Sequence, residues 1–248
     1  MKVVDLGAAS GDASDVADPP VPGATVRLTL DARLQSELQS AIISKDLLRG
    51  ADGKDHFVAV VVMGMDGQVL AMVSLPTYDL NRVDELRPAL LRDEYRRPMA
   101  NRTLQRAPPG STVKPLIASA ALTEGVITPE TTIVCNGYLF PGRPDIFRCA
   151  IYQEAGIGHG PLQLEQAIEE SCNIYFYTTG RNLGLARLER WFDAYGFGRD
   201  SVFELPEQYG HITHAASITD AAVAGCEATM EGIGHGSFGV TPLQRANA

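Results

Sequence analysis

The sequence predicts a mixed fold in which one β-hairpin precedes a series of helices. Two observations carry this prediction. His56–Met63 (HFVAVVVM) and Gln68–Ser74 (QVLAMVS) are apolar runs on either side of the turn sequence Gly64–Gly67, which is typical of a hairpin. After Pro108-Pro109-Gly110, the apolar residues follow helical spacing instead.

Composition bounds the size of the fold and excludes some functions. With 248 residues, 45% of them hydrophobic, the chain can form one large domain or two small ones. The net charge of -9 argues against nucleic-acid binding, since phosphate contacts need a basic surface. No apolar run reaches the ~18 residues of a membrane helix, so we expect no membrane segment in this chain. Residues 1–24 are small and acidic, which predicts a disordered tail or linker, without a signal peptide, before a domain at 25–248.

The N-terminal part of this domain contains a helix, the hairpin and a polar segment. Asp31 is placed as an N-cap, and apolar residues at helical spacing predict a helix to about Lys45, with Gly50 at its stop. Pro76 ends the second strand. Residues 77–107 are polar and rich in arginine, so we expect a loop with short helices there.

Helices dominate the rest of the chain. We predict them at Ser111–Glu124, from Pro161 to about Glu170, at Ile174–Leu183 and at Leu185–Tyr195. Residues 128–160 are rich in glycine and proline and show little periodicity, and a segment of that length needs a cross-link to hold it. Thr241-Pro242 is a helix-start signal, and only six residues follow it. We therefore interpret the chain as a fragment.

The first motif with chemical potential is Ser111-Thr112-Val113-Lys114. A spacing of three is about one helical turn, so both side chains lie on one face, and the helix N-terminus at the serine favours negative charge. A serine becomes a nucleophile when a base removes its proton, and burial of Lys114 would lower the pKa of its amine toward that role. The alternative is a capping serine beside a surface lysine.

The second motif is Ser171-Cys172-Asn173, at the junction of two predicted helices. A Ser-x-Asn about 60 residues after a Ser-x-x-Lys matches the second element of penicillin-recognising serine enzymes. Its serine can relay a proton, and its asparagine can bind a substrate amide. A helix junction capped by Ser and Asn explains this motif alone, but it explains the two motifs together poorly.

The chain resembles the transpeptidase domain of class B penicillin-binding proteins, in particular the type 2 elongation enzyme. The resemblance runs from about Thr25 to Ala248 and depends on segments that follow one another in the family's order. They are Thr25–Gln35 (TVRLTLDARLQ), Val60–Ser74 with Pro76 and Tyr78, Asn101-Arg102, Pro109–Pro115 (PGSTVKP), Gly125–Thr132 (GVITPETT), Phe147–Cys149 (FRC), Gly158–Gly160 (GHG), Ser171–Tyr177 and Gly232–Leu243 (GIGHGSFGVTPL).

The resemblance implies an α+β fold shared with serine β-lactamases, an antiparallel sheet covered by helices plus a helical subdomain. Only the first hairpin of that sheet is visible in this sequence. The implied activity is that of a peptidoglycan D,D-transpeptidase, which cross-links stem peptides that end in D-Ala-D-Ala. Ser111 would be the nucleophile, Lys114 the base, Ser171 the proton relay and Asn173 a substrate ligand. β-Lactams would acylate Ser111 as mimics of the dipeptide.

The resemblance also implies a place at the periplasmic face of the inner membrane, with a glycosyltransferase and other cell-elongation proteins as partners. The family's membrane anchor and pedestal domain are missing from this sequence. Its third motif, Lys-Thr/Ser-Gly, is missing too, because none of the four lysines precedes a Thr-Gly or Ser-Gly pair. We therefore expect little or no activity from this chain alone. A non-catalytic β-lactam-binding sensor or cell-wall scaffold is the main alternative, and a serine β-lactamase is a third.

Cys135, Cys149, His159 and Cys172 form a candidate zinc site. Three thiolates and an imidazole suit tetrahedral zinc, although the spacings are longer than in zinc fingers. Most of these residues lie in or beside the irregular segment, and some members of the resembled family carry zinc at matching positions, with aspartates in place of the first two cysteines. The zinc would be structural, bracing residues 128–172, and catalysis would need no cofactor. A Cys135–Cys149 disulfide and plain buried thiols are the alternatives.

Overall fold

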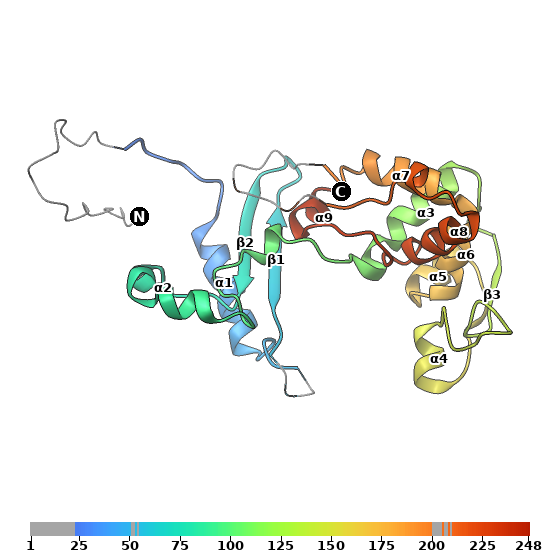
Figure 1. Ribbon diagram of the computed structural model, residues 1–248, viewed down its shortest axis with the longest axis horizontal. Coiled ribbons are helices and arrows are strands. Elements are labelled where there is room, and N and C mark those ends of the chain that lie inside the picture. The colour runs from blue at the N-terminus through green and yellow to red at the C-terminus, as the bar shows by residue number, and fades with distance from the viewer. Residues whose placement is uncertain (1–22, 51–52, 54, 200–204, 206–207, 209) are drawn as a thin grey trace, which may run out of the picture.

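The structure is a computed structural model that describes residues 23–50, 53, 55–199, 205, 208 and 210–248. The tail predicted at residues 1–24 lies almost entirely outside the described residues. Figure 1 shows two parts: a hairpin flanked by α1 and α2, and a group of helices beside it. Helices combined with small antiparallel sheets confirm the α+β class.

The first helix, α1 (Ala32–Ser44), begins where the sequence predicts. Asp31 caps it by accepting hydrogen bonds from the backbone N–H groups of Arg33 and Leu34, at 2.9 and 3.0 Å. The helix ends at Ser44, and a turn carries the chain on toward the hairpin. Its apolar side, with Leu38 and Ile42, packs on the sheet.

The predicted hairpin is formed by β1 (Val58–Met63) and β2 (Val69–Leu75), which pair antiparallel. The Gln35 side chain of α1 fastens the helix to the outer edge of β2. Its Nε2 donates to the Met72 carbonyl oxygen and its Oε1 accepts from the Met72 N–H, both at 2.7 Å. This edge of the sheet is therefore satisfied by a side chain rather than by another strand.

Short helices follow the hairpin, as the polar composition of residues 77–107 predicts. They are η1 (Leu80–Arg82), α2 (Val83–Arg92) and η2 (Arg102–Leu104). Leu104 of η2 is buried with Val69 and Leu243, so this segment connects the hairpin to the C-terminal end of the chain.

The helical part is built around α6 (Asn173–Leu183), whose side chains Tyr175 and Phe176 are fully buried. The helices α3, α5, α7 and α8 all contact it. Gly180 of α6 lies so close to Gly232, just after α8, that a side chain at either position would overlap the other segment. The neighbouring elements are η3 (Gly110–Val113), α3 (Lys114–Thr123), α5 (Leu164–Glu169), α7 (Leu185–Ala194), η4 (Ala215–Ser217) and α8 (Ala221–Glu231).

The segment 128–160 is more ordered than the sequence predicts. β3 (Ile133–Cys135) pairs antiparallel with β4 (Gly160–Leu162), and α4 (Ala150–Ala155) lies between them. The helix predicted from Pro161 was wrong at its start, because Pro161 lies in β4 opposite Val134. α5 begins three residues later, where Gln163 and Gln166 form a capping box.

The end of the chain contains one helix that the sequence predicts and follows one that it does not. Thr241 caps α9 (Pro242–Asn247) in a capping box with Gln244, which confirms the helix-start signal. α8 was missed, although Asp220 caps it by accepting from the N–H groups of Ala222 and Val223. Among the described helices, none is both long and apolar enough to cross a bilayer.

Glu231, the last residue of α8, is the most unusual charged side chain of the core. It is completely buried, and among the described residues neither carboxyl oxygen has a partner at normal hydrogen-bond distance. Burial raises the pKa of this carboxyl to about 8; repulsion by Glu227 and Glu189 adds to the shift, and the Thr213 hydroxyl opposes it. Between its ordinary pKa and about pH 8, the folded protein therefore keeps a proton that the unfolded chain has lost.

Replacing this carboxyl should make the protein less sensitive to pH. The stability associated with Glu231 is fully present below pH 4.5 and is lost as pH rises to about 8, with a slope of up to about 1.4 kcal/mol per pH unit. In urea unfolding at pH 5 to 8, Glu231→Met should stabilise the protein most at pH 8. Glu231→Gln, which cannot titrate but stays polar, should flatten the profile with less gain. Equal effects of Glu231→Met at pH 5 and pH 8 would contradict the assignment.

Candidate active site

Ser111 lies on a turn that leads into a buried helix. Gly110, with a φ of 62°, begins the 3-10 turn η3, and α3 follows from Lys114. The α-helix thus starts three residues later than the sequence predicts, and the serine precedes its first turn. Ser111 is exposed, whereas Lys114 is only 2% exposed.

The Lys114 amine connects the two sequence motifs. Its Nζ donates to three oxygens: the Ser171 carbonyl at 2.6 Å, the Ser171 Oγ at 3.0 Å and the Asn173 Oδ1 at 2.8 Å. The described hydrogen bonds of Lys114 include none to Ser111. The structure therefore brings Lys114, Ser171 and Asn173 into direct contact and leaves Ser111 one helical turn away, on the exposed side.

Burial controls the charge of this amine. It lowers the pKa of Lys114 to about 8, while the nearby thiols of Cys172 and Cys149 act in the opposite direction. The ring of Phe176, 5.4 Å from Nζ, forms part of the apolar surroundings. A substantial fraction of the lysine is therefore neutral slightly above neutral pH, which a general base requires.

The three acceptors also determine what the neutral amine can do. An ammonium has three N–H donors and no lone pair, so the three hydrogen bonds occupy all of its donors. A neutral amine keeps two donors and gains a lone pair. Since the carbonyl of Ser171 and the Oδ1 of Asn173 only accept, the two donors stay with them, and the lone pair is free to accept a hydroxyl proton. That proton can come from the Ser171 hydroxyl or from a serine placed beside it.

Ser171 sits in a tight turn between α5 and α6. Its φ of 47° is in the left-handed region, which is uncommon for residues other than glycine and often marks a functional constraint. The turn is fixed by the bond from the Cys172 N–H to the Ala167 carbonyl at 2.9 Å. On the other side of the motif, Asn173 Nδ2 donates to the Arg148 carbonyl at 3.2 Å. The predicted helix–helix junction is thus present and carries both polar side chains.

The candidate metal ligands gather at the same junction. The ligand atoms of Cys135, Cys149, His159 and Cys172 all lie within 4.8 Å of one another, and the three cysteines are buried. Cys149 Sγ is 3.6 Å from His159 Nδ1. The cysteines are free thiols, so the alternative Cys135–Cys149 disulfide is not present in the structure.

The thiols of this cluster share protons. Cys172 donates a hydrogen bond to Cys149, and this lowers the pKa of Cys149 to about 5 and raises that of Cys172. A readily formed thiolate is the form in which cysteine binds metal. His159 Nε2 lies 3.8 Å from the Glu170 carboxylate, which can orient the ring with Nδ1 toward the sulfurs.

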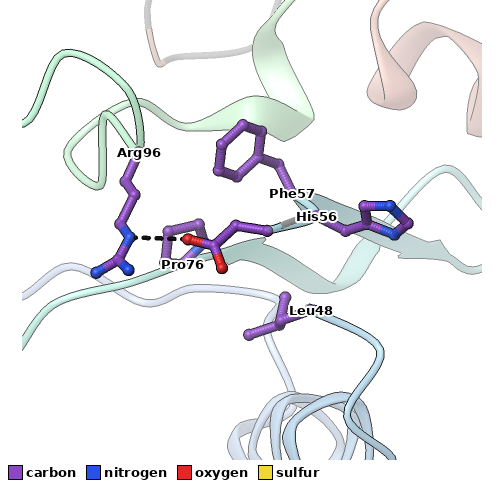
Figure 2. A pocket seen from close by; sticks show the side chains of 6 residues that line it. Leu48, His56, Phe57, Pro76 and Arg96 are labelled. Atoms are coloured by element: carbon purple, nitrogen blue, oxygen red, sulfur yellow. Dashed lines mark hydrogen bonds and ion pairs between the residues drawn. The ribbon is translucent and has the colours of Figure 1, made fainter. Parts of the chain in front are cut away.

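A separate cavity lies near the start of the hairpin and contains none of these residues. Its volume is about 190 Å³. Figure 2 shows the side chains that line it, among which Arg96 forms an ion pair with Asp55 at 3.1 Å. Leu48, His56, Phe57 and Pro76 complete its lining. The residues of the two motifs and of the cysteine–histidine cluster therefore lie outside the described lining of this cavity.

Some contacts of the site could not be found from the sequence motifs. The Arg148 carbonyl oxygen accepts a hydrogen bond from Asn173, and the Phe176 ring of α6 lies beside the Lys114 amine of α3. The Gly110 N–H donates to the Gly234 carbonyl at 3.0 Å, across 124 positions of sequence. The sequence indicates this last contact only through the resemblance of the Gly232–Leu243 segment to the corresponding segment of the family, which by itself implies no contact with Gly110.

Comparison with known proteins places this geometry in a family. The sequence model of the penicillin-binding protein transpeptidase domain matches residues 57–248. The chain belongs to this family. Peptidoglycan D,D-transpeptidase MrdA of Haemophilus influenzae is 39% identical over 247 residues, covering 93% of this chain but 35% of that protein. The chain thus spans about a third of the length of this transpeptidase.

Solved structures of family members share the fold. Pseudomonas aeruginosa PBP2 matches with a TM-score of 0.76 and 33% identity, over 92% of this chain and 51% of that chain. Helicobacter pylori PBP2 matches with a TM-score of 0.71 and 30% identity, over 87% and 40%. The resemblance to type 2 penicillin-binding proteins that the sequence motifs indicate is confirmed by these relatives.

A methyl group at Gly158 should disrupt the cysteine–histidine cluster. A Cβ there would overlap the backbone of Cys135, Asn136 and Gly137. We expect Gly158→Ala to lower the free energy of unfolding by about 1–3 kcal/mol, as overpacking does. Gly142→Ala is the control, because a Cβ there meets open space, and it should stay within about 0.5 kcal/mol. Equal urea midpoints for the two variants would show that the close contact of Gly158 with the backbone of residues 135–137 does not contribute to stability.

Proposed function

We propose that this chain supplies the acylating centre of a peptidoglycan D,D-transpeptidase, with Ser111 as nucleophile and Lys114, Ser171 and Asn173 around it. The observation that carries the proposal is the buried Lys114 amine, bonded to both other polar residues. A lysine beside a simple capping serine would instead be solvated. Family membership adds independent support, since relatives such as MrdA are D,D-transpeptidases.

The first half of the reaction forms an ester on the serine. Ser111 Oγ attacks the carbonyl carbon of the D-Ala-D-Ala amide, while the neutral Lys114 amine takes the hydroxyl proton. The C–N bond of the amide then breaks, and the terminal D-Ala leaves as an amine. Ser171, which already contacts Lys114, passes the proton to this leaving nitrogen, and Asn173 binds a substrate amide next to it.

The second half transfers the acyl group. The amine of a neighbouring stem peptide attacks the ester carbonyl, and its proton passes through Ser171 and Lys114 back to Ser111 as the ester C–O bond breaks. A β-lactam would acylate Ser111 by the same first step, its ring C–N bond opening in place of the dipeptide bond. Acylation should become faster as pH rises to about 8, because the neutral fraction of Lys114 increases up to that value.

A non-catalytic role is the second candidate, and one observation favours it. None of the lysines in the 248 residues precedes a Thr-Gly or Ser-Gly pair, so the third motif of the family is not in this sequence. In the family, the strand that carries this motif supplies part of the oxyanion hole, which is a large catalytic contribution. A β-lactam-binding sensor would still be acylated, whereas a scaffold would not.

The same family relationship suggests location and partners. Helicobacter pylori PBP2 has been solved in complex with MreC, and another structural neighbour belongs to a peptidoglycan synthase complex that coordinates polymerization and crosslinking. We place this chain at the extracytoplasmic side of the inner membrane, held there by the family's membrane anchor. Its partners would be a glycosyltransferase and other cell-elongation proteins, and its substrates the stem peptides of peptidoglycan.

The cysteine–histidine cluster would hold a structural zinc ion. Its four donor atoms lie within 4.8 Å of one another, a spacing compatible with tetrahedral zinc at about 2.0–2.3 Å from each ligand. The protein fills all four positions, so no open position remains for substrate. Zinc would tie β3 and β4 to the Ser171–Asn173 junction through Cys172 and thereby keep the junction in place.

Acylation of Ser111 by fluorescent penicillin tests the proposed function. A folded version of the protein that also carries the family's third motif should be labelled and its Ser111→Ala variant should not, while Ser119→Ala, which changes an exposed serine of α3, should label normally. Lys114→Met should slow labelling by roughly 10²–10⁴-fold, as loss of a general base does.

Three outcomes separate the candidates. Labelling together with release of D-Ala from a stem pentapeptide supports the transpeptidase. Labelling without D-Ala release supports the sensor, and no labelling of the folded version that carries the third motif supports the scaffold. Labelling of Ser111→Ala equal to that of the parent would show that another residue is the nucleophile.

Metal analysis tests the zinc proposal. Protein purified without chelators should contain about one zinc per chain, and Cys149→Ser should lose it. Cys226→Ser is the matched control, because this exposed thiol on α8 lies outside the cluster, and it should retain the metal. A Cys135–Cys149 disulfide in non-reducing mass spectrometry, or a metal content unaffected by Cys149→Ser, would rule out the site.

A further inference from the structure

The loop 232–240 lies directly against the turn that carries the nucleophile. The N–H of Gly110, the residue before Ser111, donates to the Gly234 carbonyl at 3.0 Å. Gly234 has a φ of 72°, and a Cβ on it would overlap the Gly110 carbonyl. The backbone of the loop therefore decides where Gly110, and with it Ser111, is placed.

The far end of the loop holds the chain that enters the turn. Ala107 and Val240 exchange two backbone hydrogen bonds, each of 3.0 Å. The neighbouring Gly239 exchanges another two with His211, at 2.6 and 2.9 Å. The loop thus forms short ladders on both sides, and Pro108–Gly110 are held between the contacts of Gly234 and Val240.

Between these contacts two side chains anchor the loop: Phe238 packs on Phe192 and Phe197, and Glu227 of α8 binds the loop backbone. Its Oε1 accepts hydrogen bonds from the Ser237 N–H and, at 3.4 Å, from the Thr213 hydroxyl. Gly236 comes so close that a Cβ on it would lie 2.7 Å from the same oxygen. A carboxylate that accepts a backbone N–H makes a strong, charge-assisted bond. Glu227 thereby joins α8, the loop and the segment that includes Thr213.

We propose that Glu227 is a positioning residue for the nucleophile: it holds the loop 232–240, which in turn fixes Gly110 and the Ser111 hydroxyl. The inference rests on the proposed acylation of Ser111 and adds to it a residue outside both motifs. Glu227 touches neither Ser111 nor Lys114 in the described contacts, so its effect passes through Ser237 and Gly234. Misplacement of a reacting atom by about 1 Å can cost up to 10²-fold in rate.

The test compares variants that keep or remove the acceptor. Glu227→Gln retains an oxygen at the same position and should acylate with fluorescent penicillin within a few-fold of the parent. Glu227→Met has no acceptor and should be acylated on the order of 10- to 100-fold more slowly. The decrease should lie in the rate constant of the acylation step, and the affinity of the initial penicillin complex should change little. Glu189→Met is the control, because Glu189 also accepts a backbone N–H, that of Ala215, and none of its described hydrogen bonds or ion pairs reaches the loop.

Hydrogen exchange gives a readout that does not depend on activity. Glu227→Met should speed exchange in peptides that cover 232–240 and 107–113 and leave 164–183 unchanged. A parent protein that fails to acylate would overturn the proposed function, while exchange would still decide whether Glu227 holds the turn. Parent-like exchange in Glu227→Met, or a Glu227→Gln variant as slow as Glu227→Met, would overturn the positioning role.

Discussion

The bonds from the buried Lys114 amine to Ser171 and Asn173 are the interaction on which the rest of the site depends. A buried amine is costly unless its protons are accepted, and the Ser171 carbonyl at a left-handed turn needs a donor. Each therefore requires the other, and together they fix the start of α3 against the junction of α5 and α6. The Lys114 side chain thus adds polar contacts to the packing of α3 on α5 and α6, and it joins the two motifs across the 57 residues between Lys114 and Ser171.

The cysteine–histidine cluster reinforces the same junction from the opposite side. Cys172 lies between Ser171 and Asn173, so its sulfur faces the cluster while its neighbours face the lysine. The β3–β4 pair brings Cys135 and His159 into reach, since Cys135 pairs with Gly160. The stability of the irregular segment and the geometry of the Ser171–Asn173 motif are therefore linked through Cys172.

Local signals account for what the sequence could predict. Asp31, the Gly64–Gly67 turn and Thr241-Pro242 act within a few residues, and the elements they mark appear as expected. The helix start predicted at Pro161 was wrong because proline is suited both to the first turn of a helix and to an edge strand. Only the pairing of Pro161 with Val134, which is distant in sequence, decides between the two. α8 was missed because its apolar positions are mostly alanines, which give little periodicity. The contact of Gly234 with Gly110 has no local signature at all.

The Gln35 amide on β2 makes the two edges of the hairpin unequal. The backbone of Met72 is already bonded on that side, and Asp31 donates to Leu70 beside it. Helices α9 and η2 pack against β1, but the described backbone hydrogen bonds of this strand all run to β2, and its valines are half-buried along its whole length. The backbone groups at the outer edge of β2 are therefore already bonded, whereas those at the outer edge of β1 are not bonded to another strand. A strand that extends this sheet would pair with β1, so the sheet can be extended from one edge of the hairpin only.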